Sequence, residues 1–174
     1  SIQRLAGRYQ KNPSLVKVVG DELTVSEVEQ SYIEARPGKK LNLLRKIVDH
    51  YKFSSSLVFC NTKRCVDDVA RDLKALGYDT ESIHGDMAQG QRDRVMAKFR
   101  RGHSTILVAT DVAARGIDVR CVQAVINYDI PRDDQYYVHR IGRTARMGRT
   151  GYAFTLILPT EMGKLRDIKS YAKT

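Results

Sequence analysis

The sequence lacks the features that would place the protein in a membrane or outside the cell. No run of about 18 apolar residues occurs, the length that a helix needs to cross a bilayer. Residues 1–12 lack the apolar stretch of a secretion signal. The cysteines Cys60, Cys65 and Cys121 are odd in number and have no metal-ligand spacing, which favours reduced structural thiols over disulfides or a metal site. We therefore expect a cytoplasmic protein with no membrane partner.

Motifs that carry out chemistry on their own are also absent. No G-x-x-x-x-G-K-S/T loop occurs, because residues 38–40 (Gly-Lys-Lys) and 163–165 (Gly-Lys-Leu) lack the spacing and the hydroxyl. Without that loop, a parallel sheet cannot hold a nucleoside triphosphate and its magnesium unaided. The sequence has no H-E-x-x-H, no G-x-S-x-G and no Cys/His cluster. Any catalytic role must therefore complete a site that another domain provides.

The composition is that of one folded domain with a basic surface. At 174 residues, 42% apolar and 29% charged, the chain is long enough for a single core and too apolar to be disordered. Its formal charge of +10 favours an anionic partner, most commonly a nucleic acid. A basic but merely soluble surface would explain the charge equally well, so the charge alone does not decide.

Short apolar runs alternate with amphipathic stretches from residue 28 onward. Residues 41–51 and 66–76 carry apolar side chains at helical spacing. Gly77 and Gly102 follow two such stretches, where a left-handed cap favours glycine. The alternation predicts an α/β fold with a mostly parallel sheet, helices on both faces, and ligands at the carboxyl ends of the strands. The expected strands cover residues 29–35, 56–60, 80–83, 105–109, 124–128 and 153–158.

Three arginines, Arg140, Arg143 and Arg146, stand three residues apart after an aromatic and partly apolar run. On a helix, this spacing brings neighbouring guanidinium groups close to one side. Their mutual repulsion is relieved when an anion lies between them, and the planar arginine fork binds phosphate oxygens bidentately. The segment therefore predicts a phosphate site, although a solvated basic face is an alternative.

Residues 110–118 follow an apolar strand directly and combine a hydroxyl, carboxylates, an arginine and a glycine. This is the strand-end position at which such folds bind ligands. Asp118 would accept hydrogen bonds from ribose hydroxyls, and Thr110 would donate one to a phosphate. Asp111 is also well placed to cap a helix after the strand, alongside any functional role.

Two further segments repeat this arrangement. A strand ends just before Asn61 and Thr62, and one or the other would cap the next helix, whose exposed amides and nearby basic residues would suit a phosphate. Capping alone explains both residues about as well. Residues 84–86 (His-Gly-Asp) end another strand, and Gln89 and Arg92 follow on the first helical turn. Each segment is a weak signal when taken singly.

Together, these segments resemble, in their order and in their residues, the C-terminal half of the DEAD-box RNA helicases. Residues 59–62 are similar to motif IV, 89–92 to the Q-x-x-R of the family, 110–118 to motif V, and 139–146 to motif VI. The resemblance covers the chain from about residue 28 to 171, and the motif sequences are most similar to those of bacterial members. It implies a RecA-like three-layer sandwich.

The resemblance also divides the chain. Residues 1–26 resemble the end of a first lobe with its linker, and residues 27–174 the C-terminal RecA-like domain. The chain stops within a helical pattern, so the natural protein is expected to continue beyond Thr174 and to begin earlier.

The resemblance implies that the motif residues divide into a group that contacts ATP and a group that contacts RNA. Arg143 and Arg146 would be arginine fingers that reach the γ-phosphate of ATP, and Asp118 would bind its ribose. ATP and Mg²⁺ would be held mainly by the missing N-terminal lobe. His139 and Arg140 would support the motif and its contacts with that lobe. The RNA sugar–phosphate backbone would contact Asn61, Thr62, Gly85, Gln89, Arg92, Thr110, Arg115 and Gly116.

The function implied is the C-terminal half of an ATP-dependent RNA helicase, inactive alone, which bends one RNA strand and so separates a short duplex. A free-standing RNA-binding or RNA-chaperone module is one alternative, but it leaves Arg143, Arg146 and Asp118 without a role. A lobe of a related DNA helicase is the other alternative, and the wording of residues 110–118 and 139–143 favours the DEAD-box form over it.

The sequence departs from the family pattern at Ala145, where many members have glycine. Alanine is harmless there if the local backbone is helical, and it matters only if the position needs a positive φ. Nothing in the sequence indicates an inactive relative.

Overall fold

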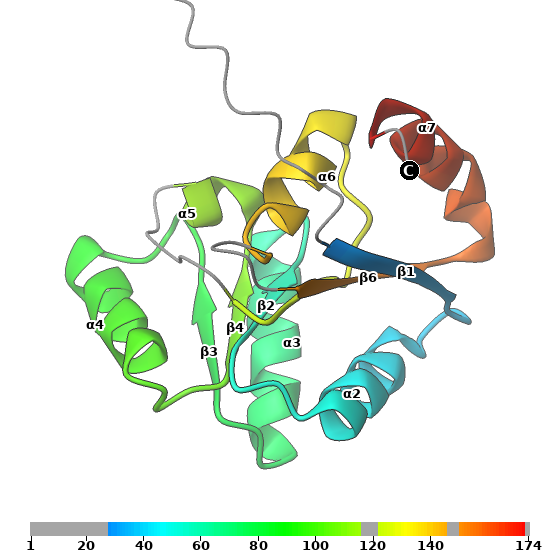
Figure 1. Cartoon of the computed structure of the whole chain (residues 1–174). Coiled ribbons are helices and arrows are strands. Elements are labelled where there is room, and N and C mark those ends of the chain that lie inside the picture. The colour runs from blue at the N-terminus through cyan, green and yellow to red at the C-terminus, as the bar shows by residue number, and fades with distance from the viewer. Residues whose placement is uncertain (1–27, 116–121, 146–149, 173–174) are drawn as a thin grey trace, which may run out of the picture.

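The computed structural model describes residues 28–115, 122–145 and 150–172, and of Arg115 only the backbone. Its centre is a six-stranded sheet in the order β1-β6-β5-β2-β4-β3, in which every pairing is parallel (Figure 1). The predicted mostly parallel α/β sheet is therefore confirmed. The strands are β1 (Val28–Glu34), β2 (Ser56–Phe59), β3 (Thr80–Ile83), β4 (Ile106–Ala109), β5 (Ala124–Asn127) and β6 (Gly151–Ile157).

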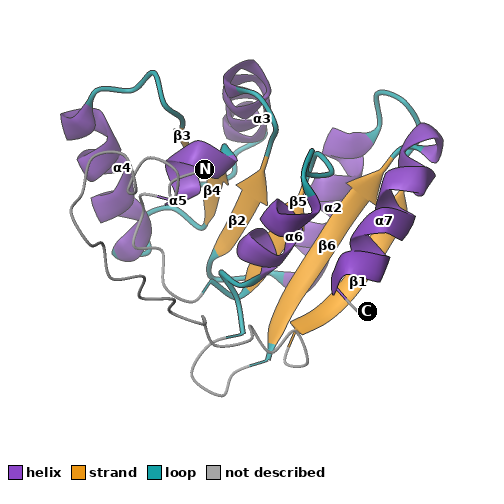
Figure 2. Ribbon diagram, turned by 90° about the horizontal axis from the view of Figure 1, so that it is seen from above, coloured by secondary structure: helices purple, strands orange, loops and turns teal. Residues whose placement is uncertain are grey.

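Helices cover both faces of the sheet, and Figure 2 shows α6 and α7 on one face with α2 behind the other. No helix in the described ranges combines the length and the apolar character that a membrane crossing requires. Residues 1–26, expected to be the end of a first lobe with its linker, lie outside the described residues. The helices are α2 (Lys40–Tyr51), α3 (Lys63–Ala75), α4 (Gln89–Arg100), α5 (Asp111–Arg115), α6 (Asp134–Ile141) and α7 (Met162–Ala172), with a short 3-10 turn, η2 (Pro159–Glu161).

The central strand β2 shows why its sequence is apolar throughout rather than alternating. Leu57 and Phe59 pack into the cluster that contains α4 and α5. Val58 and Cys60 point to the opposite face, into the cluster that contains α2 and α3. All four are at most 1% exposed, because a strand between two helical layers has no solvent side. Burial of such side chains contributes roughly 1.5–3 kcal/mol each to folding.

The helices that follow β2 and its two neighbouring strands pack on opposite faces of the sheet, and this determines where a site can form. α3, which follows β2, packs on one face, whereas α5 and α6, which follow the neighbouring strands β4 and β5, pack on the other. Loops that leave adjacent strands toward opposite faces open a crevice between them at the carboxyl ends of the strands. Residues 60–62 lie at this point.

The predicted strand ends are correct to within two residues. Gly77 and Gly102 have φ values of 88° and 73°, so both left-handed caps are confirmed. Strand β2 ends at Phe59 rather than at residue 60, although the Cys60 amide still donates to Ala109 O at 3.0 Å. Strand β6 begins at Gly151, two residues before its predicted start.

Ala145 does not have the helical backbone under which it would be harmless. Helix α6 ends at Ile141, and Ala145 has a φ of 53°, in the left-handed region. The turn is fixed on both sides. Thr144 Oγ1 donates to Val122 O at 2.6 Å, and a Cβ added at Gly151 would lie only 2.2 Å from Thr144 Oγ1. Alanine at position 145 is therefore strained by the turn in which it lies.

We predict that Ala145→Gly raises the free energy of unfolding by about 0.5–1 kcal/mol, because glycine removes the strain of the left-handed backbone. The greater entropy of glycine in the unfolded chain offsets part of this stabilisation. Urea unfolding followed by circular dichroism measures the change. Ala75→Gly, inside the last turn of α3, is the control and should destabilise the chain. A loss of stability in Ala145→Gly would contradict the strain.

Candidate functional site

The carboxyl ends of β2, β4 and β5 are joined by one buried side chain, Arg140 of α6, which is 1% exposed. Its Nε and Nη2 donate to Asp111 Oδ1 and Oδ2 at 2.7 and 2.8 Å. Nη2 also donates to Asn61 Oδ1 at 2.9 Å. Nη1 donates to Asn127 Oδ1 at 3.2 Å and to Asp129 O at 2.7 Å. All five N–H donors of the guanidinium are therefore satisfied. We call Arg140 and these four partners the Arg140 network.

The surroundings of Arg140 explain how a charge is tolerated in the interior. The carboxylate of Asp111 binds the guanidinium bidentately, which is the strongest geometry for this pair. The ring of Phe59 lies 5.0 Å from Arg140 Cζ and adds a cation–π contact. Asn127, which is fully buried, is itself fixed because its Nδ2 donates to Thr155 Oγ1 at 3.1 Å. The solvated basic face is therefore wrong for Arg140.

The arginines do not share one helical face. Helix α6 ends at Ile141 with Gly142 as its C-cap, so Arg143 leaves the helix and is half-buried. Arg143 instead lines a small hollow beside the Arg140 network, with the exposed residue His139 on the same hollow. Its other lining residues are Phe59, Asp111, Ala114, Tyr136 and Arg140. Arg146, Asp118 and Gly116 lie outside the described residues, and so does the side chain of Arg115.

The loop after β2 is held from two sides. The Asn61 amide donates to Asp129 Oδ2 at 3.0 Å, and Asn61 Nδ2 donates to Ile130 O at 2.8 Å. With its Oδ1 bound to Arg140, both polar atoms of the Asn61 side chain are hydrogen-bonded inside the protein. Thr62 is exposed, and its Oγ1 accepts the Cys65 amide at 3.1 Å, which confirms it as the N-cap of α3.

In the loop after β4, the residue that caps the following helix is not the predicted one. Thr110 Oγ1, not Asp111, accepts the helical amide of Ala113, at 3.4 Å. The Asp111 carboxylate binds Arg140 instead, 29 residues away in sequence. The Thr110 amide donates to Ile83 O at 3.4 Å, so this loop lies beside the end of β3.

The end of β3 carries the other predicted polar residues. Gly85 and Gln89 are exposed there, and Arg92 is half-buried. Gln89 Oε1 accepts Arg92 Nη1 at 3.5 Å, whereas Arg92 Nε is buried without a hydrogen-bond partner among the described residues. The predicted residues 85, 89 and 92 therefore gather at the start of α4.

An ion pair that no sequence pattern predicts links this segment to the loop after β2. The ammonium of Lys63 donates to a carboxylate oxygen of Asp86, and both side chains are exposed. That hydrogen bond lowers the pKa of Asp86 and raises the pKa of Lys63. The segments that follow β2 and β3 therefore form one rim beside the crevice.

We predict that Arg140→Ala lowers the free energy of unfolding by about 3 kcal/mol, because Asp111 and the buried Asn127 lose their charged donor. Arg140→Lys should recover little of this loss, since an ammonium cannot bind the Asp111 carboxylate bidentately as the planar guanidinium does. Urea unfolding is the measurement. Arg94→Ala, on the exposed side of α4, is the matched control and should stay within about 0.5 kcal/mol of wild type. Equal effects at both positions would contradict the network.

Comparison with known proteins places this site in a family. Residues 39–148 match the helicase conserved C-terminal domain. The chain is 46% identical over 172 residues to the DEAD-box ATP-dependent RNA helicase CshA of Geobacillus kaustophilus, an alignment that covers 99% of this chain and 37% of that protein. The chain thus spans about a third of the length of this curated relative.

Solved structures agree with the sequence match. The C-terminal domain of the DEAD-box protein Dbp5 superposes with a TM-score of 0.79 at 34% identity, covering 84% of this chain and 86% of that one. S. cerevisiae Dbp5 bound to RNA and ADP BeF3 gives a TM-score of 0.83 at 31% identity, over 98% of this chain and 46% of that one. The RecA-like fold is therefore confirmed, and the chain belongs to the helicase conserved C-terminal domain family, in its DEAD-box form.

Proposed function

We propose that this chain is the C-terminal lobe of a cytoplasmic ATP-dependent RNA helicase, and that residues 1–26 belong to the end of the first lobe and the linker. One observation carries the proposal. The Arg140 network fixes the loops after β2, β4 and β5 as one unit, with Arg143 and His139 beside it. A rigid edge of this kind can present two sets of groups, one toward a nucleotide and one toward a polynucleotide.

The nucleotide side is formed by the hollow that contains Arg143. In this chain no phosphate-binding glycine loop precedes a helix, so the triphosphate and its Mg²⁺ would be held by the N-terminal lobe. ATP supplies the phosphoanhydride bond that is broken. Arg143, together with Arg146, would stabilise the charge that develops on the γ-phosphate, and Asp118 would accept from the ribose hydroxyls. Because Arg140 anchors the peptide three residues earlier, Arg143 needs little reordering to act.

The RNA side is the rim formed by the segments after β2, β3 and β4. Thr62, Gly85 and Gln89 are exposed along it, and Lys63, which is paired with exposed Asp86, would exchange that partner for a phosphate. The buried, unpaired Nε of Arg92 supports this assignment, since a buried donor needs a partner and a phosphate oxygen would supply one. Asn61 would contribute through the second N–H of its side-chain amide, because its backbone amide already donates to Asp129. Thr110, Arg115 and Gly116 would complete the contacts.

Contacts of this kind grip the sugar–phosphate backbone and read no bases, so the binding should be largely independent of sequence. Closure of the two lobes on ATP would bend the bound strand, and a stacked duplex resists such a bend. Local strand separation would follow. S. cerevisiae Dbp5, which resembles this chain in fold, is described as bound to RNA and ADP BeF3, and this supports both sides of the proposal.

We predict that Arg143→Lys in the protein joined to its N-terminal lobe lowers RNA-stimulated ATP hydrolysis by roughly a thousandfold, because an arginine finger acts on the transition state. Steady-state phosphate release measures kcat, and binding of a fluorescent nucleotide is measured beside it. Affinity for the nucleotide should change much less than kcat.

Arg166→Lys, on the exposed side of α7, is the matched control and should retain wild-type turnover. Turnover by Arg143→Lys equal to that of this control would remove Arg143 from the catalytic groups. RNA binding by the chain alone, unchanged by nucleotide or by the first lobe, would favour the free-standing RNA-binding module instead.

We predict that Arg92→Gln weakens binding of single-stranded RNA and lowers the slope of log affinity against log salt by about 0.7, the value for one lost phosphate contact on a single strand. Fluorescence anisotropy across a salt series measures both quantities. Arg101→Gln removes the same charge at the opposite end of α4 and should leave the slope unchanged. A common slope for the two variants would exclude Arg92 from the backbone contacts.

A further inference from the structure

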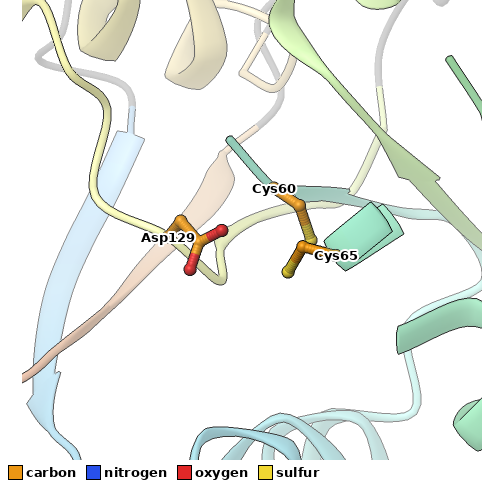
Figure 3. A group of neighbouring side chains, drawn as sticks. All are labelled: Cys60, Cys65 and Asp129. Atoms are coloured by element: carbon orange, nitrogen blue, oxygen red, sulfur yellow. The ribbon is translucent and has the colours of Figure 1, made fainter. Parts of the chain in front are cut away.

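Two cysteines and a carboxylate meet at the end of β2, on the face of the sheet opposite Arg140. Cys60 follows β2 and is fully buried, Cys65 lies in the first turn of α3 and is half-buried, and Asp129 follows β5. Figure 3 shows the two sulfur atoms beside each other with the Asp129 carboxylate opposite them. The two Sγ atoms and a carboxylate oxygen all lie within 4.8 Å of one another.

These donors are the ones that a thiophilic divalent cation takes. Zinc binds thiolate sulfur at about 2.3 Å and carboxylate oxygen at about 2.0–2.2 Å, so its tetrahedral ligands lie about 3.5–3.8 Å apart. The observed spacing therefore needs shifts of about 1 Å or less. Cysteine spacing alone does not predict this site, because its third ligand comes from a loop far along the chain.

The ligand set also suits a divalent cation. Two thiolates and a carboxylate carry three negative charges, which a divalent ion bound there would largely compensate, and binding would release the thiol protons. Asp129 is oriented for the role, since its Oδ2 already accepts the Asn61 amide at 3.0 Å.

One cation already competes for this carboxylate. Lys40 Nζ lies 3.6 Å from Asp129 Oδ1, and it also lies 3.5 Å from Glu161 Oε2. If a metal ion took Asp129, the ammonium would keep Glu161 as its partner. Entry of an ion therefore does not leave a buried lysine unpaired.

We propose that Cys60, Cys65 and Asp129 form a binding site for a thiophilic divalent cation of the zinc class, with the fourth position open to water beside half-buried Cys65. The site is independent of the proposed helicase function. Its ligands flank Asn61 and Thr62, so a bound ion would stabilise the loop after β2 and, by mass action, the folded chain.

Cobalt(II) is the first probe, because thiolate ligands give it a charge-transfer absorption that oxygen and nitrogen ligands do not. Added to the reduced 174-residue chain, it should give this band at one equivalent, and Zn²⁺ should displace it. Cys65→Ser should abolish the band and weaken Zn²⁺ binding in equilibrium dialysis by at least about tenfold. Circular dichroism confirms that each variant is folded.

Two variants make the test specific. Cys121→Ser removes the third thiol, which lies outside the described residues, and should retain the band. Lys40→Met removes the competing ammonium and should tighten Zn²⁺ binding several-fold, an effect that adventitious binding to a surface thiol would not show.

Absence of the band in the reduced chain, or a band that survives Cys65→Ser, would overturn the proposal. Loss of the band in Cys121→Ser instead would place the ion elsewhere and overturn it as well. Because these measurements need neither ATP nor RNA, their failure is distinct from a failure of the helicase proposal.

Discussion

The burial of Arg140 is the constraint on which the rest of the carboxyl edge depends. A guanidinium cannot be removed from water unless each of its donors finds an acceptor, and here the acceptors come from the loops after three different strands. Loops on a protein surface are usually free to vary in conformation. In this domain, the position of each of these loops is set by the requirement that Arg140 be satisfied, so the three loops behave as one body.

The Arg140 network gives two arginines of one segment different surroundings. Arg140 uses all its N–H donors inside the protein, whereas Arg143, beyond the end of α6, is half-buried on the hollow. The rim formed by the segments after β2 and β3 is held by the Thr62 cap, by the exposed pair of Lys63 and Asp86, and by the contact of His84 Nε2 with Asp67 Oδ1 at 3.0 Å. Each of these contacts has at least one exposed partner, and exposed pairs of this kind are weak. The proposed nucleotide side is therefore held more firmly than the proposed RNA side, which can adjust to a strand.

Local pattern was enough to predict the architecture but not the contacts that organise the site. All six strands and the glycine caps follow from periodicity and from the backbone preferences of glycine, which act over a few residues. The pairing of Arg140 with Asp111 joins residues 29 apart, and no spacing rule connects them. Asn127 is the least visible partner, because it ends an apolar strand and shows its role only when α6 packs above it. The early end of α6 and the left-handed Ala145 likewise arise from the tight turn against Gly151, which is a tertiary contact.

Asn61 and Asp129 connect the two faces of the sheet at the end of β2. Asp129 directs its backbone carbonyl to Arg140 and its carboxylate to the cysteine side, where Lys40 lies. Asn61 gives its side-chain oxygen to Arg140 and its amide to that same carboxylate. A shift of the carboxylate by about 1 Å toward a bound cation would therefore pull on the Asn61 amide, and hydrogen bonds weaken steeply when their geometry is lost. Any event on the α2 and α3 face thus reaches the Arg140 network through two residues, with no rearrangement of the sheet between them.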